Sequence, residues 1–188
     1  LNISCPNIKE GGITFGCSLQ GTHDVVAAVR HVTDLPIFPK LTPNVTDVAS
    51  FARAAQDAGA DAVSLVNTFL AMAIDIDTRR PSLSNVVGGL SGPAIRPIAV
   101  RMVYECAAAV RIPIIGMGGI ASARDVVEFL IAGATAVQVG TANFEDPFIW
   151  RKLGDGLTAY LQQHGCRSVR DIIGTVDLAE RDTAWISS

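Results

Sequence analysis

The stretch that decides the fold is IPIIGMGGIASARDVVEFLIAGATAVQVGT, residues 112–141. It opens on a short, mostly β-branched run of the kind found in strands that are buried on both faces. Ser122 then predicts the N-cap of a helix, Gly133 predicts its end, and a second apolar run follows at 136–139. Because the order is strand, glycine loop, helix, strand, the stretch predicts a βαβ unit whose parallel strands end at the same edge of a sheet.

Both predicted strands are followed by glycines, so the two loops are expected to lie side by side. Gly116, Gly118 and Gly119 follow the first strand, and Gly140 follows the second. Backbone N–H groups that no Cβ shields suit a phosphate, and (β/α)₈ barrels commonly bind phosphate after strands seven and eight. The loops therefore indicate a phosphate site. The alternative is that these glycines only permit tight turns.

The composition indicates a globular protein with a sizeable core. The chain has 188 residues, 49% of them hydrophobic, and a net charge of −3, which gives no general attraction for nucleic acid. Its apolar runs are far shorter than a membrane span. Four scattered cysteines without a C-x-x-C pair argue against structural zinc, an iron–sulfur cluster and a disulfide framework. We therefore expect a reducing, cytoplasmic setting.

Short apolar runs recur outside the central stretch at the spacing of an α/β protein. A (β/α)₈ (TIM) barrel needs eight strands in about 250 residues and gathers its site residues at their carboxyl ends. We predict a single α/β domain, residues 1–188, formed by strands 4–8 of such a barrel with the first three strands missing. A complete open sheet is the alternative. The five predicted strands lie near residues 1–4, 36–41, 62–66, 112–116 and 136–139.

The connecting segments predict helices and two irregular regions. Asp24 and Thr46 are the expected N-caps of the first two helices. Residues 8–21 are polar and glycine-rich, a length typical of a functional lid or of disorder. Residues 69–91 are expected to form an irregular insertion. The helices are predicted at about 24–31, 47–58, 93–110, 122–132, 146–164 and, as a short turn, 168–173.

The end of the first strand carries three polar residues, Asn2, Cys5 and Asn7, whose side chains can converge on one small ligand. Amides present a donor and an acceptor together, which matches the edge of an imide or pyrimidine ring. Cys5 is a candidate base or nucleophile, provided that its thiolate forms near neutral pH. The alternative is a buried structural cysteine, which is the commoner role of a free thiol.

Two later strand ends carry further candidates. Lys40 ends the second predicted strand, and a lysine that points into a barrel mouth needs an anionic partner. One such partner is the N1–C2=O edge of a flavin, which becomes negative on reduction. A solvated surface lysine is the alternative. Asn67 and Thr68 add an amide and a hydroxyl at the end of the third strand.

The sequence predicts no metal site. The three histidines are dispersed, and Asp75 and Asp77 have no further ligands near them in the sequence. These two aspartates are expected to be solvated or paired with Arg79 or Arg80. Cys106 falls in a predicted helix and is expected in the core.

Six motifs occur in a fixed order along nearly the whole chain: N-I-S-C-P-N from Asn2, P-K-L-T-P-N-V from Pro39, L-V-N-T from Leu65, G-G-L-S-G-P-A-I-R-P-I-A from Gly88, G-M-G-G-I from Gly116 and V-Q-V-G-T-A-N-F from Val137. In these motifs the chain closely resembles the dihydroorotate dehydrogenases, and best the class 1B catalytic subunits, which use cysteine as their base. It departs from them at its start, where three strands are lacking. It also departs at Pro39, where a β-branched residue is expected.

The resemblance implies an FMN-dependent oxidation of (S)-dihydroorotate to orotate in pyrimidine biosynthesis. Cys5 would remove the proton from C5 while a hydride leaves C6 for flavin N5, and the lid at 8–21 would exclude water. The pyrimidine would be held by Asn2, Asn7, Asn67 and Thr68. The flavin would be contacted by Asn2, Lys40, Val66, Gly92, Gly118, Gly119, Gly140 and Thr141.

The resemblance also implies partners. It suggests a homodimer at the core of a heterotetramer, with electrons passing to a second subunit that carries FAD and a [2Fe–2S] centre and then to NAD⁺. A dihydropyrimidine dehydrogenase is an alternative with similar motifs, although Asn7 and residues 71–81 favour dihydroorotate. A non-catalytic barrel fragment is another alternative. If the polypeptide ends at Leu1, it is expected to aggregate and to retain little FMN.

Overall fold

The computed structural model describes residues 1–4 and 16–179, and a parallel β-sheet lies at its centre. The sheet contains β1 (Val63–Leu65), β6 (Ile114–Met117) and β7 (Ala136–Gln138), in the order β1-β6-β7. Both pairings are parallel, which confirms the βαβ unit predicted from the central stretch.

Two further segments extend this sheet by single bridges only. Lys40 forms a parallel bridge to Asn2 on one side and to Ser64 of β1 on the other. The prediction of full strands at 1–4 and 36–41 is therefore wrong, although both segments run parallel beside β1 in chain order. The second segment contains two prolines, which have no N–H to donate to a neighbouring strand, so the ladder there is reduced to the bridges of one residue.

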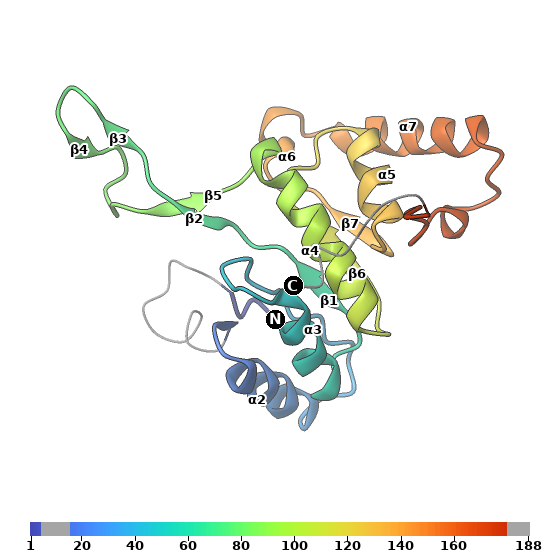
Figure 1. Ribbon diagram of the computed structural model, residues 1–188, viewed down its shortest axis with the longest axis horizontal. Coiled ribbons are helices and arrows are strands. Elements are labelled where there is room, and N and C mark those ends of the chain that lie inside the picture. The colour runs from blue at the N-terminus through green and yellow to red at the C-terminus, as the bar shows by residue number, and fades with distance from the viewer. Residues whose placement is uncertain (5–15, 180–188) are drawn as a thin grey trace.

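Helices pack against the sheet, one between each pair of successive parallel segments (Figure 1). Leu65, Ile114 and Phe129 are among the side chains that this packing buries completely or nearly so. The result is the α/β architecture that the sequence predicted. The helices are α2 (Leu19–Arg30), α3 (Val48–Asp57), α4 (Arg96–Ala109), α5 (Ala123–Ile131) and α7 (Ile149–Gln163).

Several helix ends follow the local sequence as predicted. Ser122 caps α5, and the carboxylate of Asp125 accepts a hydrogen bond from the Ser122 backbone N–H at 2.8 Å. Gly133 follows the same helix with a φ of 114°, and Gly59 follows α3 with a φ of 94°. Both angles lie in the left-handed region, which favours glycine because it has no Cβ.

Two predicted N-caps are wrong. α2 begins at Leu19 and is capped by Ser18, well before the predicted Asp24. α3 is capped by Asp47, one residue after the predicted Thr46. In both helices the side-chain oxygen of the cap accepts a hydrogen bond from the backbone N–H three residues later, which satisfies a free donor of the first turn.

Residues 69–91 form a long antiparallel hairpin, which we call the arm (Figure 1). β2 (Phe69–Ala71) pairs with β5 (Gly88–Leu90), and β3 (Ile74–Asp75) pairs with β4 (Arg80–Pro81). The irregular insertion predicted here is therefore wrong. These strands are too short, and too rich in glycine, proline and charge, to show the period of a strand in the sequence. The arm projects away from the sheet and its helices (Figure 1).

The remaining elements are short. η1 (Pro93–Ile95) leads directly into α4, and together they confirm the helix predicted at 93–110. α6 (Ala142–Glu145) follows β7, and η2 (Val169–Asp171) confirms the turn predicted near 168–173. None of the helices in the described part of the chain has the length and apolar character needed to cross a membrane.

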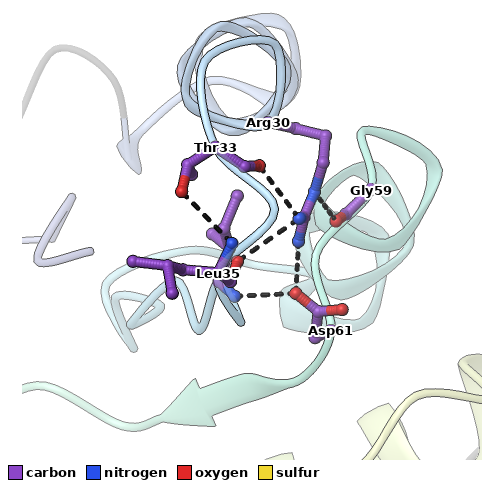
Figure 2. A network of polar contacts seen from close by, with 6 residues as sticks. Arg30, Thr33, Leu35, Gly59 and Asp61 are labelled. Atoms are coloured by element: carbon purple, nitrogen blue, oxygen red, sulfur yellow. Dashed lines mark hydrogen bonds and ion pairs between the residues drawn. The ribbon is translucent and has the colours of Figure 1, made fainter.

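Arg30 ties α2 to the loops at the amino ends of the strands (Figure 2). Its guanidinium donates to the backbone carbonyls of Gly59 at 3.0 Å and of Thr33 and Leu35, both at 3.3 Å, and it pairs with Asp61. This cluster lies at the opposite end of the sheet from the glycine loops. It is therefore a structural contact remote from the site described next.

Candidate active site

A cavity of about 250 Å³ opens at the carboxyl ends of the parallel strands. Apart from Asn2, all the residues predicted to contact a flavin line it: Lys40, Val66, Gly92, Gly118, Gly119, Gly140 and Thr141. Two of the residues predicted to hold a pyrimidine, Asn67 and Thr68, line it as well. The sequence did not predict the other four lining residues, Ser91, Ile95, Met117 and Phe144.

The two glycine loops form a cup at one end of this cavity. Gly118 and Gly119 have φ angles of 129° and 77°, in the region that favours glycine. A Cβ on Gly119 would lie 2.6 Å from the carbonyl oxygen of Gly92, so a larger residue would displace the loop. At Gly140, in contrast, a Cβ would meet no atom within 4 Å. The backbone of the second loop is therefore open to the cup.

The cup offers backbone donors to a ligand. In the part of the chain that the structure describes, the N–H groups of Gly119, Gly140 and Thr141 donate to no protein acceptor. The side-chain amide of Asn143 donates to the carbonyl oxygens of Val139 and Gly140, at 2.5 and 3.2 Å. These bonds occupy the carbonyls of the loop and leave its N–H groups for an anion.

Asn143 was not among the predicted site residues. Its signal in the sequence is weak, since it is one asparagine in the first turn of the short helix α6, within the motif V-Q-V-G-T-A-N-F. Thr141 also makes a long-range contact that the sequence does not show: its hydroxyl donates to Ser91 Oγ at 2.9 Å. That bond joins the end of the arm to the loop after β7.

An ion pair joins α4 to α5, the helix that follows the first loop of the cup. Arg96 in α4 pairs with Asp125 in α5, and Arg96 Nε lies 3.1 Å from a carboxylate oxygen of Glu128. Asp125 also accepts hydrogen bonds from the N–H groups of Ala121 and Ser122, at 3.0 and 2.8 Å. Burial raises the pKa of Asp125, but these hydrogen bonds and the Arg96 guanidinium lower it by more, so that it lies below its usual value. The pair holds the loop between β6 and α5.

Asn67 joins the polar wall of the cavity to the first segment of the chain. Its Nδ2 donates to Ser4 Oγ at 2.9 Å and to the Ser4 carbonyl oxygen at 3.1 Å, and lies 3.5 Å from Asn2 Oδ1. Its Oδ1 accepts a hydrogen bond from the Thr68 N–H at 2.8 Å. Asn2 lines a neighbouring cavity of about 390 Å³ together with Lys40. The structure therefore brings Asn2, Asn67 and Thr68 close together.

Two predicted site residues, Cys5 and Asn7, lie outside the described residues, as does the greater part of the lid predicted at 8–21. In the sequence Cys5 directly follows Ser4, which contacts Asn67. Cys106 is fully buried in α4, and burial raises its pKa to about 12. Its burial confirms the prediction that Cys106 is a core residue. So high a pKa also leaves almost no thiolate to react.

Lys40 brings a positive charge to the cavity. Its side chain is half-buried, and among the described residues its Nζ takes part in no hydrogen bond or ion pair. A half-buried ammonium without a counter-charge suits an anionic ligand. The site thus combines a cup of N–H donors, a free ammonium and a wall of amide and hydroxyl groups. This combination fits an elongated molecule with a phosphate at one end and a polar ring at the other.

The fold is that of an α/β protein whose cavity lies at the carboxyl edge of its parallel strands, the edge at which such folds place their binding sites. Within this class the chain belongs to the dihydroorotate dehydrogenase family, because the family model described as "Dihydroorotate dehydrogenase" matches residues 1–161. The resemblance found in the six sequence motifs is thereby confirmed.

Named relatives agree with this assignment. The dihydroorotate dehydrogenase B (NAD(+)), catalytic subunit, of Bacteroides thetaiotaomicron is 55% identical over 178 residues, which cover 95% of this chain and 59% of that protein. The protein of the same name from Porphyromonas gingivalis is 56% identical over 176 residues, covering 94% of this chain and 57% of that protein. The chain therefore spans a little under three-fifths of these relatives.

A solved structure agrees as well. The crystal structure of dihydroorotate dehydrogenase in complex with ferulenol from Eimeria tenella superimposes with a TM-score of 0.76 and 26% sequence identity. The match covers 93% of this chain and 52% of that one. The arrangement of helices and strands described above is therefore that of a dihydroorotate dehydrogenase over almost the whole length of this chain.

Proposed function

We propose that this chain is part of an FMN-dependent dihydroorotate dehydrogenase, which oxidises (S)-dihydroorotate to orotate in pyrimidine biosynthesis. The observation that carries the proposal is the single cavity at which the free N–H groups of the cup, the unpaired Lys40 and the polar wall of Asn67 and Thr68 meet. The names of relatives that share more than half of their aligned residues with the chain support the same reaction.

Residues 1–188 are proposed to be a single partial domain that corresponds to strands 4–8 of a (β/α)₈ barrel. The order of the parallel segments supports this, because it runs from Asn2 through Lys40 to β1, β6 and β7 without a reversal. Open doubly wound sheets reverse their strand order at a switch point, whereas a barrel adds each strand beside the last. The sequential order therefore favours the barrel over the open sheet.

The residues of the cavity fit FMN. The two glycine loops of the cup, with Gly92 and Gly118 beside the ligand, would surround the phosphate and the ribityl chain. The free N–H groups of Gly119, Gly140 and Thr141 would donate to them. Bound FMN supplies an acceptor for a hydride. Asn2, Lys40 and Val66 would contact the ring, and the Lys40 ammonium would stabilise negative charge at the ring's edge.

Four residues would hold the edges of the pyrimidine, namely Asn2, Asn7, Asn67 and Thr68. Asn67 is already oriented by its bonds to Ser4 and to the Thr68 backbone, which reduces the entropy lost when it contacts a ligand. Cys5, as the thiolate, would remove the proton from C5 of the substrate. The lid at 8–21 is proposed to cover Cys5 and to exclude water during hydride transfer.

We further propose that electrons leave through a second subunit that carries FAD and a [2Fe–2S] centre, so that reduction of NAD⁺ requires this subunit. The relatives' names support a partner, since each is called a catalytic subunit of an NAD(+)-linked enzyme. A homodimer at the core of the assembly is also proposed. Exposed apolar side chains on the arm support an association surface: Leu70, Met72, Ile74 and Ile76.

The reaction is tested in the completed barrel, in which residues 1–188 follow the proposed first three strands. This protein, purified with its flavin bound, is mixed without oxygen with dihydroorotate or with dihydrouracil. Bleaching of the flavin absorbance reports reduction. We expect dihydroorotate to bleach the flavin within seconds of mixing, and dihydrouracil to leave it oxidised. Bleaching by dihydrouracil alone would support the dihydropyrimidine dehydrogenase alternative, and bleaching by neither substrate would contradict the proposed activity.

The base is tested with Cys5→Ser in the same assay. The substitution should slow flavin reduction by about 10²–10⁴-fold at pH 7 and shift its pH dependence upward, because serine ionises at far higher pH than the reference thiol pKa of about 8.5. Cys166→Ser is the matched control, since Cys166 is a free thiol that follows α7, outside both the cavity and the proposed lid. Reduction of Cys5→Ser at the wild-type rate would exclude Cys5 as the base.

A further inference from the structure

Asn44 does not line the cavity, yet its side chain is hydrogen-bonded to residues 68–70, where the arm leaves the sheet and which we call the arm root. Its Nδ2 donates to the backbone carbonyl oxygen of Thr68 at 3.1 Å, and its Oδ1 accepts a hydrogen bond from the Leu70 N–H at 2.9 Å. One carboxamide thus offers a donor and an acceptor to the same edge of β2, as the peptide group of a neighbouring strand would.

Asn44 takes the place of a backbone hydrogen-bond partner just beyond the point where pairing between residues 41 and 67 ends. The Asn67 N–H donates to the carbonyl oxygen of Leu41 at 3.1 Å. Pro43 follows shortly afterwards and has no N–H to extend this pairing. Thr42 Oγ1 accepts hydrogen bonds from the Asn44 N–H at 3.2 Å and from its Nδ2 at 3.3 Å, which orient the carboxamide toward β2.

The Thr68 side chain packs over Gly89 in β5. Gly89 lies opposite Leu70 in the pairing of β2 with β5, and a Cβ at this glycine would lie 2.2 Å from Thr68 Oγ1. The Thr68 hydroxyl therefore occupies the space that any larger residue at 89 would need. Its carbonyl is fixed by Asn44 and its side chain is packed over Gly89, so the arm root has one defined position.

We infer that Asn44 is a positioning residue for the pyrimidine site. Its carboxamide fixes the position of the backbone at residues 67–70 and thereby the orientation of the Asn67 and Thr68 side chains. This inference rests on the proposed function, in which Asn67 and Thr68 hold the substrate. Asn44 is not among the residues that line the cavity, so its loss is expected to lower substrate affinity and to leave the flavin in place.

The inference is tested in the flavin-loaded holoenzyme with Asn44→Ala. The dissociation constant of orotate, from titration of the flavin spectrum, and KM for dihydroorotate should rise about 5- to 150-fold, the range expected for two ordinary hydrogen bonds. Flavin content and kcat should stay within about twofold. Asn85→Ala is the matched control, because Asn85 is an exposed arm residue whose side chain makes no hydrogen bond within the described residues. It should leave all these values unchanged.

Asn44→Asp keeps the inference testable even where Asn44→Ala folds poorly. A carboxylate accepts from the Leu70 N–H as before, but it cannot donate to the Thr68 carbonyl. We expect it to raise the dissociation constant of orotate at least as much as alanine does. Wild-type orotate affinity in both Asn44 variants would overturn the inference.

Backbone amide exchange at Leu70 separates this inference from the proposed function. Exchange should accelerate about tenfold in Asn44→Ala and stay slow in Asn44→Asp and Asn85→Ala. If the wild-type holoenzyme binds no orotate, the proposed function is wrong, and the exchange rates alone decide whether Asn44 holds the arm root. Unchanged exchange at Leu70 in Asn44→Ala would overturn the inference whatever the protein binds.

Discussion

Lys40 carries a charge that the described residues leave unpaired. Lys40 forms β-bridges to Asn2 on one side and to Ser64 on the other, so its backbone is fixed on both sides while its side chain lines the cavity. Burying part of an ammonium without a partner is unfavourable. At the scale of single residues, this unbalanced charge is the feature most directly tied to the proposed flavin.

Lys40→Ala is expected to lower the midpoint potential of the bound FMN by about 20–60 mV, because it removes a positive charge that stabilises the reduced ring. Lys152→Ala is the control, since Lys152 is exposed and already paired with Asp146 at 2.6 Å. The potential is measured by anaerobic redox titration of the flavin spectrum. A potential that is unchanged or higher, with FMN still bound, would place Lys40 away from the ring.

Asp125 is the second residue on which the cup depends. Its side chain is buried, and it receives the N–H groups of Ala121 and Ser122 together with the Arg96 guanidinium. Because its folded pKa lies below its unfolded value of about 3.9, its contribution to stability is present above that value. The contribution is lost as the pH falls through the lower, folded pKa.

Asp125→Asn should therefore lower the free energy of unfolding by about 1–3 kcal/mol at pH 7, because two backbone donors and Arg96 lose a charged acceptor. The difference from wild type should shrink as the pH falls below the unfolded value of about 3.9, and should go on shrinking as the pH passes through the lower, folded pKa. Urea titrations of the holoenzyme across this range provide the measurement. Asp155→Asn, at an exposed position of α7, is the control. A gap that stays constant with pH would show that the charge of Asp125 contributes nothing.

At the scale of elements, the amino ends of the strands are held by Arg30 at the end of α2 (Figure 2). Its partner Asp61 precedes β1 and accepts a hydrogen bond from the Ile37 N–H at 2.7 Å. That bond, and then the Arg30 guanidinium, hold the pKa of Asp61 below its usual value. One side chain thus joins α2 to the loop before the second parallel segment and to the loop before β1.

Arg30→Ala is expected to lower the free energy of unfolding by about 1–3 kcal/mol, because three carbonyl groups lose a charged donor. Arg30→Lys should restore less than half of this loss, since an ammonium cannot match the planar fork of a guanidinium. Substrate affinity should not change, because the cluster lies at the opposite end of the sheet from the cavity. Thermal and urea unfolding are compared with Arg124→Ala, an exposed position in α5. A shift in orotate affinity with unchanged stability would contradict this structural role.

At the scale of the whole molecule, the side of the sheet that faces away from the helices is open. Leu1 and Phe38 are 42% and 43% exposed, and they line a cavity of about 390 Å³ with Ile115 and Gln138. In a closed barrel the corresponding positions face one another across a packed interior. In the proposed barrel, this face would belong to the packed interior.

The 188-residue polypeptide, produced by itself, is therefore expected to bind a hydrophobic dye strongly, to associate, and to retain little FMN. Fusing to it the segment of the Bacteroides relative that corresponds to the proposed first three barrel strands should reduce dye fluorescence several-fold and yield a yellow protein. Dye fluorescence, light scattering and flavin content provide the measurements. A monomer with one FMN, a cooperative melt and no dye binding would contradict the barrel assignment.

The sequence alone determined the features that depend on a few neighbouring residues. Gly59, Gly119 and Gly133 stand where the backbone takes positive φ, and Ser122 caps its helix through a bond three residues away. The buried β-branched runs and their spacing predicted β1, β6 and β7, and the motifs between them identified the family. In each case the chemical cause lies within one turn or one strand, so the sequence shows it directly.

Only the tertiary structure decided which distant groups meet. Arg96 and Asp125 are 29 residues apart, Arg30 and Asp61 are 31 apart, and Asn44 reaches Leu70 across 26. The arm's strands were equally hidden, since two or three residues carry no period and their pairing is made across the hairpin. Hydrophobic periodicity reports burial, but a long-range hydrogen bond depends on how packed helices and loops bring one donor and one acceptor within about 3 Å.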